Sequence, residues 1–361
     1  MSVYKERRRF NRGTVCSYLL GFVAVQIGIV IAVEHAGGEL RDPFFSRVAG
    51  RLAARRADAP DRPLLLVLGS SRTRMGFDAG LATRTDGQVL VFNFGEFGAG
   101  PMLEQVFLRR LLADGVRPDM VLIEVVPLQI ASGIGVTGEE TRLDLARLTW
   151  TELSKIAGYY RFSAKAYAQW LKNRSLVCVS RQHEMHDALG IDIPQAETTL
   201  RSSVNLALDG DDYGFAPWPT PTPQERAASI QDHLVRFRPQ LAASRLAEGP
   251  ARAVRELVAL CRRENLPFGI ILMPECSGLR EQYPPEFRAD LNCLFEDLRR
   301  EGEFDLIDAR EWVADDGFWD AHHLDVAGAQ LFSARFARVA LPRLKQQLAT
   351  PKCDGEKCAV E

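Results

Sequence analysis

The chain has 361 residues, of which 46% are hydrophobic and 25% are charged. These proportions are ordinary for a globular protein, and the length allows one large domain or two small ones with ample core. The formal net charge of −2 gives no reason to expect nucleic-acid binding. The seven cysteines are too sparse over this length for a disulfide scaffold.

A basic segment precedes an uncharged one at the N-terminus. Residues 1–12 hold five basic residues and one acidic residue, and residues 13–33 hold no charge. As a helix, the uncharged segment would be about 31 Å long, close to the roughly 30 Å hydrocarbon core of a bilayer. A cleaved signal peptide fits less well because the apolar run is long and no small-x-small site follows it. We therefore expect a single-pass membrane anchor with a cytoplasmic tail at 1–12 and the rest outside, in the periplasm if the source is bacterial.

After a charged juxtamembrane helix and linker at 34–62, where Phe44, Phe45, Val48 and Leu52 have near-helical spacing, apolar strand-like runs alternate with helix-like segments. Strands are expected at 64–68, 89–93, 120–126, 268–273 and 304–307. Helices are expected at 77–83, 102–113, 251–264 and 285–301. Continuous apolar strands that alternate with helices are typical of a parallel sheet covered on both faces. The pattern predicts an α/β three-layer sandwich with a central parallel sheet over residues 63–348.

One stretch interrupts the alternation. Residues 131–250 have helical patterns at 143–156 and 163–171, and then a loop rich in proline and tryptophan at 215–221. We expect a helical insertion that either caps the C-terminal edge of the sheet, where ligands bind in such folds, or serves only as structure. The polar tail at 349–361 contains Cys353 and Cys358, which offer a small local disulfide.

Two short blocks carry catalytic residue types. Gly69-Ser70-Ser71 directly follows the first strand, and Asp320-Ala321-His322-His323 precedes a helix-like run. A serine at the carboxyl end of a parallel strand is exposed in the substrate crevice. A carboxylate three residues before a histidine can hold the imidazole while its other nitrogen faces the serine. The blocks together predict a serine-nucleophile active site.

These blocks resemble the SGNH (GDSL-type) hydrolase family, together with Asn93-Phe94-Gly95-Glu96-Phe97-Gly98 between them. The resemblance implies Ser71 as nucleophile, His323 as base and Asp320 as its orienting carboxylate. It also implies oxyanion donors at the backbone N–H groups of Ser71 and Gly98. Ser70 stands where the family usually has Asp and competes with Ser71; His322 is the rival base, and Gly95 is the reserve oxyanion donor.

The chain departs from the family in the third block, which normally supplies an Asn after the third strand. Here the sequence is Glu124-Val125-Val126-Pro127-Leu128-Gln129, so the side-chain oxyanion donor is missing or is replaced, with Gln129 as one option. The same departure occurs in membrane-anchored relatives that transfer acyl groups on cell-surface polymers. The segment His183-Glu184-Met185-His186 is one residue too short for a zinc-binding His-Glu-x-x-His helix. We expect neither a metal nor a cofactor.

The resemblance implies a membrane-anchored serine esterase or O-acyltransferase that acts on acyl esters of a cell-envelope glycan. A multi-pass membrane acyltransferase is the partner that would supply acyl groups in the transferase case. The alternative is a non-catalytic envelope protein that keeps the fold to bind glycan or a partner protein. The intact Ser, Asp and His favour the enzyme, and the missing Asn favours the alternative.

Overall fold

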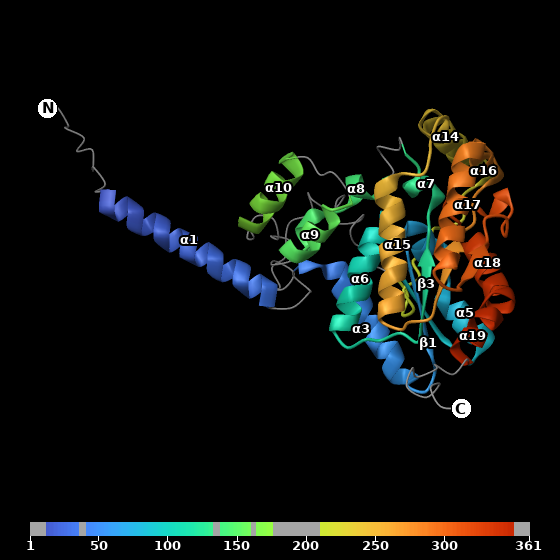
Figure 1. The fold of residues 1–361 in the computed structure, drawn as a ribbon, viewed down its shortest axis with the longest axis horizontal. Coiled ribbons are helices and arrows are strands. Elements are labelled where there is room, and N and C mark those ends of the chain that lie inside the picture. Colours follow the sequence, from blue (N-terminus) through green and yellow to red (C-terminus); the bar gives the residue numbers. More distant parts are fainter. Residues whose placement is uncertain (1–11, 36–40, 133–137, 160–163, 176–209, 350–361) are drawn as a thin grey trace.

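The computed structural model describes residues 12–35, 41–132, 138–159, 164–175 and 210–349 of the chain (Figure 1). The predicted disulfide between Cys353 and Cys358 and the segment from His183 to His186 lie outside these residues.

Five parallel strands form one sheet in the order β2-β1-β3-β4-β5. This is the order of flavodoxin-like doubly wound sheets. The predicted strands are confirmed to within two residues at each end. The strands are β1 (Leu64–Gly69), β2 (Leu90–Gly95), β3 (Met120–Glu124), β4 (Phe268–Leu272) and β5 (Asp305–Asp308). The first four are buried throughout, as their unbroken apolar runs require, whereas β5 is a partly exposed edge.

Helices cover both faces of the sheet, so the predicted α/β architecture with a central parallel sheet is confirmed. One layer contains α6, α15 and α17, and the other contains α5 and α18, with neighbouring helices of each layer in contact (Figure 1). Their bounds are α5 (Ala79–Asp86), α6 (Pro101–Ala113), α15 (Glu248–Arg263), α17 (Pro285–Arg300), α18 (Val326–Val339) and the following α19 (Leu341–Ala349). Short helices follow three strand ends: α4 (Ser71–Gly76), α7 (Pro127–Ile130) and α16 (Ser277–Gln282).

Capping residues correct two predicted helix boundaries. The helix expected at 77–83 begins two residues later, at Ala79, because Asp78 caps α5 by accepting from the Leu81 N–H at 2.7 Å. The helix expected at 143–156 is divided into a 3₁₀ turn (Leu145–Arg147) and α9 (Trp150–Ile156). Thr149 and Glu152 form a capping box that starts α9 afresh.

Residues between β3 and β4 form further helices outside the two layers. They are α8 (Glu139–Arg142), α9, α10 (Ala164–Ser175) and α14 (Pro223–Leu241). Figure 1 shows α9 and α10 on the side of the sheet where the N-terminal helix lies, whereas α14 lies at the end of the sheet near α7.

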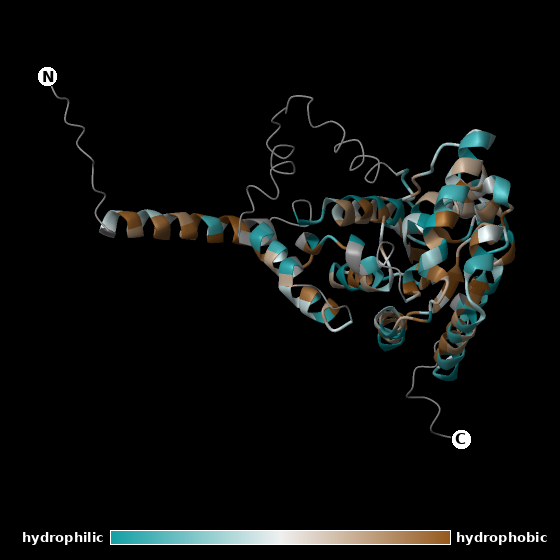
Figure 2. Cartoon of the chain, turned by 90° about the horizontal axis from the view of Figure 1, so that it is seen from above, coloured by the Kyte–Doolittle hydropathy of each residue, from teal (hydrophilic) through white to brown (hydrophobic). Residues whose placement is uncertain are grey.

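The N-terminal helix α1 (Arg12–His35) extends away from the sheet (Figure 2). Its segment Gly13–Ile31 has a mean hydropathy of 2.1, and none of it is buried in the protein. A helix of this length and composition can cross a membrane. The expected juxtamembrane helix is α3 (Pro43–Asp58), whose Phe44, Phe45, Val48 and Leu52 are buried in the core. The chain after the anchor is therefore packed onto the α/β domain.

Candidate active site

The nucleophile block forms a tight turn from β1 into α4. Ser70 is the N-cap of α4, and its Oγ accepts from the Arg72 N–H at 3.1 Å. Ser71 is the first helical residue, and its side-chain Oγ lies 2.8 Å from Nε2 of His323. Ser71 itself is 7% exposed. The structure thus places Ser71, and not Ser70, against the predicted base.

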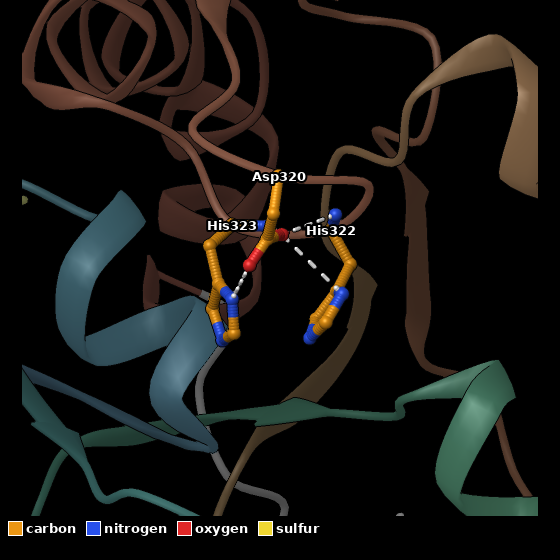
Figure 3. A group of neighbouring side chains, drawn as sticks. All are labelled: Asp320, His322 and His323. Atoms are coloured by element: carbon orange, nitrogen blue, oxygen red, sulfur yellow. Dashed lines mark hydrogen bonds and ion pairs between the residues drawn. The ribbon is translucent and has the colours of Figure 1, made fainter. Parts of the chain in front are cut away.

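The base and its carboxylate lie on the loop before α18. Asp320 Oδ1 accepts from the backbone N–H groups of His322 and His323, each at 2.8 Å. His323 Nδ1 lies 2.8 Å from Asp320 Oδ2 (Figure 3). Burial alone would raise the pKa of Asp320, but His322 and His323 hold it well below its usual value. An ionised carboxylate only accepts, so His323 Nδ1 carries the proton and Nε2 presents a lone pair to Ser71.

The rival base, His322, lies on the other side of Asp320 (Figure 3). Its Nδ1 is 3.4 Å from Asp320 Oδ1, and its ring centroid is 4.0 Å from that of His323. Burial lowers the pKa of His322 well below its usual value, and the nearby His323 and Arg72 lower it further against the opposing effect of Asp320. The imidazole that faces the serine is that of His323, whose Nε2 lies 2.8 Å from Ser71 Oγ.

Asp320, His322 and His323 also bring nitrogen and oxygen atoms close enough together to be considered as metal ligands. A tetrahedral zinc ion with bonds of about 2.0–2.1 Å holds its ligand atoms roughly 3.3 Å apart. The 2.8 Å separation of His323 Nδ1 and Asp320 Oδ2 is shorter than this and matches a charge-assisted hydrogen bond. The spacing therefore fits a proton relay better than a metal centre.

Glu124 occupies the end of β3, where the resembled family carries its third block. Its Oε2 accepts from the Ser70 N–H at 2.7 Å, the Ser70 Oγ at 3.0 Å and the Thr73 Oγ1 at 2.7 Å. The Glu124 carboxylate thus holds the serine turn in place through Ser70 and Thr73. Glu124 therefore holds the nucleophile in place, and its Oε2 is engaged by these three donors.

Arg72 connects the serine turn to the loop after β4. Its guanidinium donates to the carbonyl oxygens of Met273 at 2.7 Å and Pro274 at 2.8 Å, and to Glu275 Oε1 at 3.1 Å. The Tyr283 hydroxyl donates to the same carboxylate at 2.9 Å. Sequence reasoning missed this buried network, because charged residues on separate segments of the chain carry no pattern that indicates their pairing.

Backbone N–H groups near the turn were expected as oxyanion donors. The Glu96 carbonyl accepts from the Ala99 N–H at 3.1 Å, and Gly98 has φ +74°, which gives a turn that favours glycine. Within the described residues, the N–H groups of Ser71 and Gly98 have no hydrogen-bond acceptor. Gly95 does not fit the reserve role, because its N–H donates to Asn93 Oδ1 at 2.9 Å.

Two polar side chains of these blocks, those of Asn93 and Gln129, have different surroundings. Asn93 donates from Nδ2 to the carbonyl oxygens of Thr73 and Phe77, both at 2.8 Å, and so supports α4. Gln129 lies in α7, and its Oε1 is buried without a hydrogen-bond partner among the described residues. A Cβ atom on Gly100 would lie 2.9 Å from that oxygen, so Gln129 faces the start of α6.

The end of the insertion covers the base loop. The ring of Trp218 is parallel to that of His323 within 5°, with 6.2 Å between centroids, and packs edge-on against Trp319. The Trp218 carbonyl accepts from the Val326 N–H at 3.0 Å. From α14, His233 Nε2 lies 3.7 Å from Asp320 Oδ2. Of the two expectations for the insertion, these contacts favour the one in which it caps the site.

A family model for a protein of unknown function (DUF1574) matches residues 32–142. The chain is similar to that family over a segment that contains the serine turn and Gly98 but not the loop with Asp320 and His323. A comparison with curated proteins finds no match.

Proposed function

We propose that the protein is an SGNH-type serine esterase or O-acyltransferase that acts on acyl esters of a cell-envelope glycan. The observation that carries the proposal is the hydrogen-bonded series from Ser71 Oγ through His323 to Asp320, with both links at 2.8 Å. Three side chains from the two ends of the α/β domain meet in the order that nucleophilic catalysis requires.

The mechanism follows from the proton positions. Ser71 Oγ attacks the ester carbonyl while its proton moves to His323 Nε2, and Asp320 stabilises the resulting imidazolium. The N–H groups of Ser71 and Gly98 are the proposed donors to the tetrahedral oxyanion. His323 then protonates the leaving alcohol, and an acyl group remains on Ser71.

The second half-reaction decides between the two activities. His323 removes a proton from the incoming hydroxyl, which attacks the acyl-enzyme and regenerates Ser71. Water as the acceptor gives an esterase, and a sugar hydroxyl gives a transferase. In the transferase case, the acyl groups come from a multi-pass membrane acyltransferase.

The proposed location rests on α1 and its basic flank. The tail at 1–12 is cytoplasmic in this proposal, α1 crosses the membrane, and the α/β domain lies outside, where envelope glycans are found. The alternative, a scaffold that binds glycan without chemistry, is favoured by one feature. The chain lacks the Asn of the third block, and Glu124 at that strand end uses its Oε2 to hold the serine turn.

Turnover of model esters separates these alternatives. The full chain in detergent should hydrolyse p-nitrophenyl acetate, and adding acetylated or free glycan oligosaccharides should show whether acyl groups pass to water or to sugar. Ser71→Ala should abolish both reactions, whereas the neighbouring Ser70→Ala should retain activity. Equal rates for wild type and Ser71→Ala would leave the scaffold as the better account.

A further inference from the structure

Two large apolar side chains are exposed on neighbouring helices of the insertion. Trp150, the first residue of α9, is 62% exposed, and Leu171 of α10 is 60% exposed. The Trp150 ring packs against that of Trp170 with 5.5 Å between centroids, so the two helices share one surface. Trp170 Nε1 donates to the Leu148 carbonyl at 3.3 Å, which fixes α10 to the domain.

This surface adjoins the candidate membrane helix. Helix α10 contacts α1, and Figure 1 shows α9 and α10 between α1 and the α/β layers. Only residues 36–40 separate α1 from the start of the domain segment at Arg41. If α1 crosses a bilayer, α9 and α10 are the parts of the domain held beside that bilayer.

The chemistry of the surface matches a lipid headgroup layer. Exposed lysines lie on both helices, at Lys155, Lys165 and Lys172. The sequence of α10 contains no acidic residue, and Glu152 of α9 is paired with Arg110 at 2.8 Å. Tryptophan with lysine on a short helix is typical of segments that lie in the membrane interface.

We infer that the surface formed by α9 and α10, with Trp150 and Leu171 at its centre, inserts into the lipid headgroup layer beside α1. The catalytic domain would then be held at one orientation to the membrane and would not swing freely on its anchor. The inference concerns a binding surface away from Ser71 and does not depend on the proposed chemistry.

Photocrosslinking in the full chain tests this placement. The photoreactive residue p-benzoylphenylalanine replaces Trp150 or Leu171 in protein that is reconstituted into phospholipid nanodiscs. Leu20, which is 71% exposed within the apolar span of α1, is the positive control. Leu331, which is 66% exposed on α18, is the matched control on the domain. Thermal unfolding of each variant verifies that it is folded.

We expect lipid adducts at positions 150 and 171 in yields comparable to that at Leu20 and well above that at Leu331. Adducts at Leu20 but none at 150 and 171 would overturn the inference. Equal yields at 150, 171 and Leu331 would do the same, because the surface would then be no closer to lipid than the rest of the domain. Adducts of 150 and 171 with protein in place of lipid would show that another chain covers the surface.

Discussion

The buried Arg72 donates to Glu275 at 3.1 Å and so joins the serine turn to the loop after β4. That loop is tied in turn to the base loop, because the Cys276 N–H donates to the Ala321 carbonyl at 3.1 Å. Ala321 lies between Asp320 and the histidines. The position of His323 relative to Ser71 is therefore set partly through Arg72.

This link predicts that Arg72→Lys lowers kcat for ester hydrolysis while KM changes little. Lysine keeps the charge but cannot make the three hydrogen bonds of the guanidinium. A displacement of about 1 Å at a catalytic group costs on the order of 10²-fold in rate. Arg300→Lys, at an exposed arginine, is the control and should match wild type. Equal kcat values for the two variants would contradict a positioning role.

The relay itself predicts strong non-additivity. His323→Ala should reduce turnover by on the order of 10⁴-fold or more, and Asp320→Ala/His323→Ala should be little worse than His323→Ala alone. His322→Ala should have a far smaller effect, because its ring does not reach Ser71. Steady-state kinetics on wild type, Asp320→Ala, His323→Ala, the double variant and His322→Ala would test this, and losses that multiply in the double variant would show that the residues do not act as a unit.

Glu104 on α6 predicts a stability change with pH. Both of its carboxylate oxygens are buried without a partner among the described residues, and burial, followed by Glu124 and Glu139, raises its pKa well above the usual value. An unfolded glutamate ionises near pH 4.3, so between that pH and the native pKa the folded state holds the extra proton. Stability should fall as pH rises through this window, by up to about 1.4 kcal/mol per pH unit.

Glu104→Gln should therefore unfold at a higher temperature than wild type at pH 7–8, and the gain should shrink towards pH 4. Glu281→Gln, at an exposed glutamate, is the control and should not change this pH dependence. Thermal unfolding followed by circular dichroism gives the comparison. A lower unfolding temperature for Glu104→Gln at pH 8 would mean that the carboxylate is ionised and stabilised.

The basic flank of α1 predicts the orientation of the chain. Alkaline phosphatase, which is active only outside the cytoplasm, should be active when fused after Glu361. The same fusion to residues 36–361, which lack α1, should be inactive. If the full-length fusion shows no phosphatase activity, the α/β domain lies in the cytoplasm, where it has no access to envelope glycans.

Much of the fold could be predicted from local patterns. Strands such as Leu64–Gly69 are continuous apolar runs. Their short length and their alternation with helix-like segments identify them as strands buried on both faces of a sheet. The start of α5 and the break before α9 were missed because Asp78 and Thr149 stand within an otherwise helical pattern. Asp and Thr also occur inside helices that continue, so the sequence alone did not mark them as caps.

Ser71 and His323 are 252 positions apart, so no local pattern links them; their approach was expected from the chemistry of the two blocks and from the family resemblance. The network of Arg72, Glu124 and Glu275 could not be predicted, since charged residues at three strand ends have no period that indicates their pairing. Gln129 was a reasonable substitute donor by position, but its amide oxygen faces the start of α6.

Covalent labelling by a fluorophosphonate probe tests the central claim most directly, because the probe reacts only with a serine activated by its base. Mass spectrometry of the labelled full chain should locate the adduct at Ser71. Ser71→Ala and His323→Ala should abolish labelling, and Ser70→Ala should largely retain it. Label on another serine, or unchanged labelling in Ser71→Ala, would contradict the account.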